Sequence, residues 1–248
     1  MNDHRNDGNG NGSGNGSGKG SDEPRAVAGR YARRRGADRY SPLQPDVMML
    51  LQERQRALHR RLAAQGITDL APLHVVEVGC GSGGNLLELL RLGCMPQHLQ
   101  GIELLPERHA QARQVLPAAT RLWLGDAAEA SVADASQDLV LQSTVFSSLL
   151  DDAFQQRLAA AMWRWLRPGG AVLWYDFTVD NPGNADVRGM PLARVQALFP
   201  QARIQSQRVT LAPPLARAVC RVHPGLYAVF NLLPWLRTHV LAWAEKPA

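Results

Sequence analysis

The stretch HVVEVGCGSGGN, which runs from His74 to Asn85, decides the fold of this chain. Its first five residues are almost all apolar, which predicts a buried strand, and a glycine-rich turn follows them directly. Such a turn lets a ligand approach the backbone closely and presents the amide groups of the next helix to it. The stretch therefore predicts a ligand site at the carboxyl end of the first strand.

The spacing of the glycines alone leaves the nature of the ligand open. Read through Gly83 the pattern is GxGxG, whereas read through Gly84 it is GxGxxG, the fingerprint of dinucleotide-binding proteins. Glu77 stands two residues before the first glycine. A carboxylate there suits a cationic amino-acid moiety better than a pyrophosphate, so Glu77 argues against a dinucleotide.

Strands and helices alternate along most of the chain, which predicts βαβ units and a parallel sheet with helices on both faces. One or two short helices are expected in the apolar, proline-broken stretch 213–235, for which a membrane-surface helix is the alternative. The predicted strands are 74–78, 99–104, 121–124, 138–142, 171–177, 202–211 and 238–244, and the predicted longer helices are 47–62, 85–92, 106–116, 151–166 and 191–199.

The first residues of the chain differ from the rest in composition. Met1 to about Pro24 are mostly Gly, Asn, Ser and Asp, which cannot bury enough apolar surface to offset the entropy of ordering. We predict a disordered tail over residues 1–24 and order from about Tyr31 onward.

Composition and cysteine content restrict the class of protein. The 248 residues are 45% apolar, and the net charge of +5 permits an anionic partner without requiring one. Three scattered cysteines fit a reduced cytoplasm better than a disulfide framework, and no His/Cys spacing predicts a metal site. No run approaches the roughly 20 apolar residues that cross a bilayer. We expect a cytoplasmic protein with no metal and no transmembrane segment.

The stretch from Val75 to Asn85 resembles the first motif, (E/D)xGxGxG, of class I S-adenosylmethionine-dependent methyltransferases. Further landmarks of that family follow in order. Glu103, which ends the second predicted strand, resembles the residue that binds the ribose hydroxyls, and Asp126 resembles the acid that binds the adenine amino group. Arg167-Pro168-Gly169-Gly170 is similar to the LxPGG turn before the fifth strand.

The resemblance implies an α/β three-layer sandwich with a seven-stranded, mostly parallel, Rossmann-like sheet and an antiparallel last strand. It implies a cofactor-binding domain over residues 73–248, preceded by a lid and a helix over 25–72. S-adenosyl-L-methionine is the implied cofactor. The residues it implies for cofactor binding are Glu77, Gly79, Cys80, Gly81, Gly83, Glu103, Leu104, Asp126, Ala127 and Gln142.

Candidate substrate residues lie around the carboxyl end of the fifth predicted strand and in the entry segment. Asp176 is the candidate general base, because an oxygen acceptor benefits from one. A polar loop after this strand suggests hydrogen bonding to a polar acceptor, and Arg188 in it could clamp a phosphate or carboxylate. The candidate substrate contacts are Tyr31, Arg34, Tyr40, Tyr175, Asn181 and Arg188.

The entry segment, with its aromatic and arginine residues at 31–35 and 39–41, resembles a bacterial subgroup associated with surface-polysaccharide and similar glycan pathways when it is taken together with two later stretches. These are Asn181-Pro182 with Asp186–Gly189 after the fifth strand, and Trp235–His239 before the last strand. We therefore expect methyl transfer to an oxygen of a polar small molecule such as a sugar or glycan intermediate. The alternatives are an RNA methyltransferase, a nucleotide-dependent oxidoreductase and an inactive methyltransferase-like binding protein. No nucleic-acid partner is expected, since no RNA-binding module is recognisable, whereas peripheral membrane contact stays open.

Overall fold

The computed structural model describes residues 22–33 and 41–248, and its described part contains one mixed sheet in the order β3-β2-β1-β4-β5-β7-β6. All pairs are parallel except those of β7, which runs antiparallel to both β5 and β6. This confirms the predicted fold class. The strands are β1 (Val75–Val78), β2 (Leu99–Glu103), β3 (Arg121–Leu124), β4 (Gln137–Ser143), β5 (Leu166–Phe177), β6 (Arg203–Leu211) and β7 (Arg237–Glu245).

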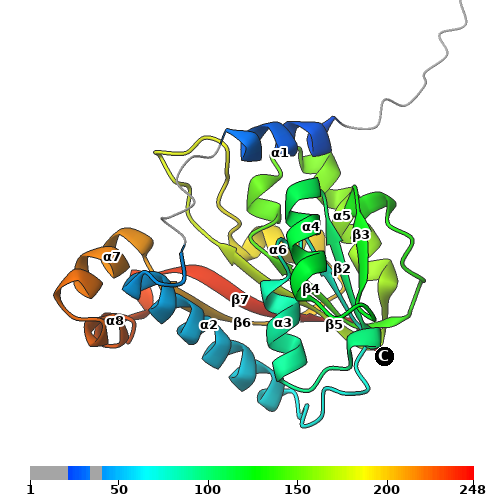
Figure 1. Ribbon diagram of the computed structural model, residues 1–248, viewed down its shortest axis with the longest axis horizontal. Coiled ribbons are helices and arrows are strands. Elements are labelled where there is room, and N and C mark those ends of the chain that lie inside the picture. Colours follow the sequence, from blue (N-terminus) through cyan, green and yellow to red (C-terminus); the bar gives the residue numbers. More distant parts are fainter. Residues whose placement is uncertain (1–21, 34–40) are drawn as a thin grey trace, which may run out of the picture.

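Helices cover both faces of the sheet (Figure 1). One face packs against α2 (Pro45–Ala64), α3 (Gly84–Arg91) and α4 (Pro106–Val115), and the other against α5 (Asp152–Trp165) and α6 (Leu192–Leu198). Side chains of β5 alternate between the two cores, with Val172 and Trp174 in one and Leu173 and Tyr175 in the other. Burial on both faces explains why the central strands are nearly continuous apolar runs.

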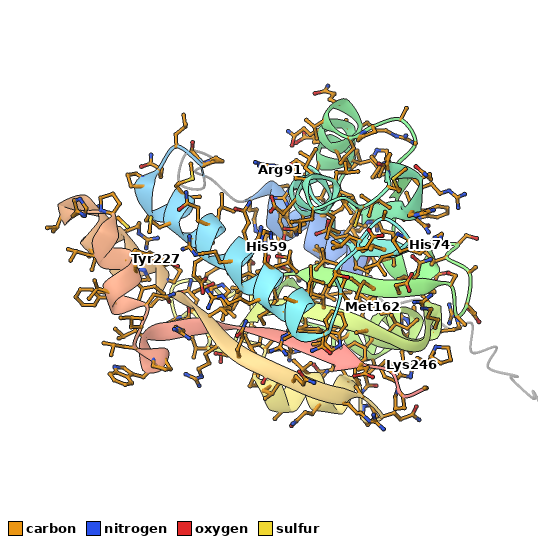
Figure 2. The ribbon with its side chains drawn as sticks, turned by 90° about the horizontal axis from the view of Figure 1, so that it is seen from below. His59, His74, Arg91, Met162, Tyr227 and Lys246 are labelled. Carbon is orange, nitrogen blue, oxygen red and sulfur yellow. The ribbon has the colours of Figure 1, made fainter. Side chains whose placement is uncertain are left out.

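The connection between β6 and β7 forms a small lobe of two helices, α7 (Pro213–Val222) and α8 (Gly225–Phe230), followed by the 3-10 turn η5 (Pro234–Leu236). The inward side chains of the lobe form a third core, which is closed by side chains from α2. Figure 2 shows Tyr227 of this lobe at one end of the molecule, with His74 and Lys246 toward the other. This stretch, for which one or two short helices were predicted, therefore contains two.

The amino-terminal helix α1 (Glu23–Ala32) was not predicted from sequence. The predicted tail reached residue 24 and order was expected only from about Tyr31, whereas the helix begins at Glu23. Its first turn has Pro24 and the acidic Glu23, both favourable at a helix start. Arg30 pairs with Glu23 at 2.5 Å, and both side chains are buried. Residues 1–21 of the predicted tail lie outside the described residues.

Replacement of Trp174 tests the packing of the hydrophobic core between the sheet and the helices α5 and α6. The Trp174 side chain is fully buried, and its ring centroid lies 4.6 Å from that of Phe146 and 6.2 Å from that of Phe199. We expect Trp174→Ala to lower the free energy of unfolding by about 3–5 kcal/mol in urea denaturation, because it opens a cavity. Trp123→Ala, at a side chain 43% exposed on β3, is the control and should cost much less. Equal losses would contradict this packing.

Candidate cofactor and acceptor site

A pocket lies at the carboxyl ends of β1, β2, β3 and β4, with α1 lying across it (Figure 1). The site lies beside the reversal of strand order between β1 and β4, where open α/β sheets bind ligands. Its lining consists of Pro24, Val27, Tyr31, Val78, Gly79, Ile102, Glu103, Leu104, Leu105, Arg108, Gly125, Asp126, Ala127, Ser143, Thr144, Val145, Ser148, Phe154 and Leu158.

The turn after β1 requires glycine. Gly79 and Gly83 have φ of +65° and +88°, in the left-handed region that disfavours other residues. A Cβ on Gly79 would lie 2.5 Å from Cγ2 of Val145, and a Cβ on Gly83 would lie 2.9 Å from Cδ1 of Leu116. The turn is therefore packed directly against the segment that follows β4.

Glu103 joins this turn to the end of β2. Its Oε2 accepts a hydrogen bond from the Gly81 amide at 2.8 Å, and its Oε1 accepts one from the Leu105 amide at 2.8 Å. Each carboxylate oxygen can accept a second bond, and Glu103 lines the pocket. The carboxylate is thus held in place by the backbone and can still accept two hydroxyl groups, as a ribose presents.

Asp126 lies across the pocket from the glycine turn, after β3. Its carboxylate accepts a hydrogen bond from the Ala128 amide at 2.9 Å and starts the 3-10 turn η3 (Ala127–Glu129). Burial raises the pKa of Asp126 above its usual value. Five of the ten predicted cofactor residues therefore line the pocket, namely Gly79, Glu103, Leu104, Asp126 and Ala127.

Glu77 lies behind the turn, fully buried on the face of α2 and α3. Its Oε1 accepts from Nδ2 of Asn85 at 2.5 Å, while its Oε2 has no hydrogen-bond partner among the described residues. Burial raises the pKa of Glu77 to about 7, although Asn85 and the charge of Arg54 act to lower it. A buried carboxylate oxygen without a donor suits a cationic ligand group. This orphaned oxygen therefore fits the ammonium of an amino-acid cofactor.

Two further predicted cofactor residues, Cys80 and Gln142, do not line the pocket and instead pack against or hydrogen-bond the elements around it. Cys80 packs against β2, where its Sγ would lie 2.7 Å from a Cβ on Gly101, and burial raises the pKa of its thiol far above the usual range. Gln142 accepts from the Val145 amide at 3.1 Å and donates to the Tyr175 carbonyl at 3.4 Å. It thereby fixes the backbone that faces the glycine turn.

The predicted substrate residues are not brought together. Tyr31 lines the pocket, with its hydroxyl 3.3 Å from Oγ of Ser148. Tyr175 points to the opposite face of the sheet, where its hydroxyl lies 2.8 Å from Oγ1 of Thr210. Arg34 and Tyr40 lie outside the described residues.

The side chains of the polar loop after β5 contact its own backbone, α5 and, through Asp186, Arg33 at the end of α1. Asn181 accepts from the Gly183 amide at 3.1 Å, and Arg188 pairs with Asp152 at 2.5 Å. Neither Asn181 nor Arg188 lines the pocket. Their predicted role in substrate binding stays a prediction, and in this structure they shape the loop.

Asp176 is fully buried below the 3-10 turn η4 (Phe146–Ser148), and it does not line the pocket. It accepts hydrogen bonds from the amide of Ser147 at 3.1 Å and from its neighbour Phe177 at 3.0 Å. Burial raises the pKa of Asp176 to about 7. This geometry makes Asp176 a positioning residue for η4, so its role as general base stays a prediction.

Sequence reasoning missed much of the acceptor side of the pocket. Thr144 has φ of +57°, which is strained for a β-branched residue and is typical of functional sites, but no local sequence signal reveals it. Arg108, in the first turn of α4, stacks over the Tyr31 ring at 4.7 Å. Its position just after Pro106 could have placed it at this edge. Val27 and Tyr31, four residues apart, could have indicated α1.

Comparisons with solved structures agree with this architecture. A methyltransferase described as S-adenosylmethionine-dependent, from Archaeoglobus fulgidus, is 14% identical with a TM-score of 0.57, over 79% of this chain and 96% of that one. A putative methyltransferase of Haloferax volcanii, solved in complex with the activator Trm112, is 18% identical with a TM-score of 0.58, over 87% and 99%. The 1,6-didemethyltoxoflavin-N1-methyltransferase of Burkholderia thailandensis, solved with 1,6-didemethyltoxoflavin and S-adenosylhomocysteine, is 20% identical with a TM-score of 0.55, over 78% and 76%.

At these identities the likenesses establish the fold, which is that of the class I S-adenosylmethionine-dependent methyltransferases. The family model of a methyltransferase domain matches residues 75–170, which span the glycine turn, Glu103, Asp126 and the end of β4. The chain is therefore an S-adenosylmethionine-dependent methyltransferase, and S-adenosylmethionine is its methyl donor. No curated protein matches the sequence.

The described ranges 22–33 and 41–248 contain neither a metal cluster nor a membrane-spanning helix. No cluster of three His, Cys, Asp or Glu side chains there could hold a metal ion. No helix there is long and apolar enough to span a bilayer.

Gly79 offers a direct test of the cofactor turn. We expect Gly79→Ala to weaken S-adenosylhomocysteine binding at least tenfold by calorimetry, because the left-handed backbone and the contact with Val145 both oppose a Cβ. Gly84→Ala is the matched control, since a Cβ there meets nothing within 4 Å and the residue begins α3. Equal effects of the two substitutions would contradict the packing of the turn.

The raised pKa of Asp176 predicts how stability depends on pH. Between about pH 4 and 7 the folded state holds a proton that the unfolded chain has released, so stability falls as pH rises through this window. In urea denaturation of the cofactor-free protein, Asp176→Asn should show a smaller fall than wild type. Glu107→Gln, an exposed control on α4, should keep the wild-type slope. A wild-type slope in Asp176→Asn would mean that this carboxyl is not buried.

Proposed function

We propose that this methyltransferase transfers the methyl group to an oxygen of a polar small molecule, of the class of sugars and glycan intermediates. The observation that carries the proposal is a group of hydroxyl side chains around the part of the pocket beyond Glu103 and Asp126. Tyr31 comes from α1, Ser143 and Thr144 from the end of β4, and Ser148 from η4. Hydroxyls both donate and accept, so they match an acceptor that itself carries several hydroxyls.

Helix α1, which lies across the pocket and forms its roof, favours a small acceptor over a macromolecular one. α1 places Val27 and Tyr31 in the wall and is tied down by Arg30, which pairs with Glu23 and donates to the Ser148 carbonyl at 2.9 Å. The Leu150 amide donates to the same Glu23 carboxylate at 2.6 Å. A macromolecular acceptor would have to displace this helix, whereas a small molecule fits below it.

The chemistry required of the chain is limited, since the sulfonium of the cofactor activates its own methyl group. The chain must hold the acceptor in line with that methyl and keep water out. The apolar side chains of Val145, Phe154 and Leu158 line the pocket and exclude water, while the hydroxyl groups orient the acceptor.

The proton of an oxygen acceptor must also leave. Glu103 and Asp126 are the only carboxylates in the described lining, and both are committed to the cofactor in this proposal. Asp176 can take the proton only if η4 shifts, because Ser147 covers it. An acceptor whose hydroxyl has a low pKa can lose its proton to water, so it would need no shift of η4.

The Burkholderia relative is named for methylation of a nitrogen of a small heterocycle, and its structure holds that heterocycle. This supports a small-molecule acceptor for the fold and makes a nitrogen acceptor the nearest rival to the proposed oxygen. The two are separated by which products carry the methyl group.

Calorimetry tests the cofactor part of the proposal. We expect micromolar binding of S-adenosylmethionine and S-adenosylhomocysteine, at least tenfold weaker binding by Glu103→Ala because the ribose hydroxyls lose their acceptor, and no binding of NAD or NADP. Glu107→Ala is the control, as an exposed acid of the next helix. Dinucleotide binding in place of the sulfur ligands would contradict the cofactor assignment.

The acceptor is then tested by transfer of isotope-labelled methyl to panels of sugars and nucleotide sugars, small heterocyclic amines and transfer RNA. Label on a sugar oxygen, identified by mass spectrometry, supports the proposal. Label on a heterocyclic nitrogen or on RNA alone would overturn the acceptor while leaving the cofactor site intact.

A further inference from the structure

The outer surface of the lobe between β6 and β7 has no role in the site described above. The inward side chains of the lobe, among them Ala216, Val219 and Tyr227, already close a complete small core against α2. The outward side chains are therefore not needed for that packing, and their chemistry calls for a separate explanation.

Large apolar side chains are exposed on this outer surface. Val222 at the end of α7 is 78% exposed, Val229 on α8 is 57% exposed, and Leu232 and Trp235 after α8 are 73% and 71% exposed. Leu233 adds to the same turn. Scattered apolar residues on a surface are ordinary, but five within fourteen positions of one small lobe mark an interaction site. We call these residues the apolar tip.

The charge around the apolar tip has a single sign. From Val187 through Ala244 the sequence has no aspartate or glutamate, although the whole chain has 22. Arg188 and Arg194 pair with Asp152 on α5, and no ion pair joins the other five arginines to a carboxylate in the described part of the chain. Of those five, Arg217 and Arg221 lie on α7, and Arg208 and Arg237 lie near the ends of β6 and β7 that join the lobe. Arg203 lies at the other end of β6, opposite Glu245, and does not belong to this surface.

Acidic groups on the neighbouring helix form no ion pair with the arginines of the lobe. Of the two α2 carboxylates near the lobe, Glu53 is buried and accepts from Thr210. Asp46 lies near Cys220 of α7 and is the one acidic group of α2 beside this surface. Arg237 donates to the carbonyls of Asn231 and Arg208, which fixes its position without cancelling its charge.

The lobe lies at the edge of the sheet that carries the pocket. β7 is antiparallel to both β5 and β6, so β6 ends where β5 ends, with Leu211 opposite Arg237 and Phe177 opposite His239. Figure 1 shows α7 and α8 projecting beyond this end of the strands. A partner bound at the apolar tip would therefore lie on the pocket side of the molecule.

We propose that the outer face of the α7–α8 lobe docks on an anionic lipid bilayer. Trp235, Leu232 and Val229 would enter the boundary between headgroups and acyl chains, where tryptophan is favoured. Arg217 and Arg221 would meet the lipid phosphates, and each such cation adds attraction to an anionic surface. The combination of an apolar tip with unpaired arginines matches this surface in both chemistry and sign.

Sedimentation of the full chain with vesicles tests the proposal. We expect binding to vesicles of phosphatidylcholine mixed with phosphatidylglycerol, at least tenfold weaker binding to phosphatidylcholine alone, and weakening by salt. Leu232→Ser with Trp235→Ser, and separately Arg217→Gln with Arg221→Gln, should each weaken binding at least tenfold. Trp123→Ser is the matched control, because it removes an exposed tryptophan from β3 at the far end of the sheet order.

Binding of the two double variants as tight as wild type, or no binding to the mixed vesicles, would overturn the proposal. Two readouts identify the rival occupants, which would also overturn it. Analytical ultracentrifugation detects a second copy of the chain as a dimer that the Leu232→Ser, Trp235→Ser variant loses, and a filter assay detects RNA bound in place of lipid. Calorimetry with S-adenosylhomocysteine should give wild-type values for every variant, so a failed docking surface is distinguishable from a failed cofactor site.

Discussion

The contact between Gly79 and Val145 is the constraint on which the site depends. It presses the turn after β1 against the segment after β4, at the reversal of strand order. The left-handed glycines turn the Gly81 amide toward Glu103, and Gln142 fixes the Val145 amide from the other side. The turn after β1 and the segment after β4 thus form one packed unit at the pocket.

Two buried carboxyls support this unit from opposite faces of the sheet, Glu77 on the face of α2 and α3 and Asp176 on the face of η4. Burial raises the pKa of each to about 7. Near neutrality both therefore sit close to half-ionised in surroundings that disfavour charge, which costs stability relative to an apolar core. For Glu77 a cationic ligand group would offset this cost, because one of its oxygens has no donor. Such local conflicts are typical of functional sites.

The sheet could be predicted almost completely from the sequence, because its strands are buried on both faces and their apolar runs have clear ends. The part of the pocket wall formed by Gly79, Glu103 and Asp126 was predictable for a related reason, since these residues stand at strand ends and the topology brings these ends together. The part formed by α1 and the segment after β4 was not, and most of the predicted substrate residues do not line the pocket. Tyr175 follows the pattern of a strand end, but strand alternation turns it away from the pocket, and the polar loop after β5 satisfies its own backbone.

α1 escaped prediction because what holds it lies elsewhere in the chain. Arg30 and Glu23 are ordinary surface residue types, yet both are buried through contacts with Ser148 and Leu150, more than a hundred residues away. Breaking either of these contacts would leave the Arg30–Glu23 ion pair intact within α1 but would remove a hydrogen bond between a buried charged group and the backbone, which is unfavourable. The helix is therefore held over the pocket by tertiary contacts to residues 148 and 150, which no local pattern in its own sequence reveals.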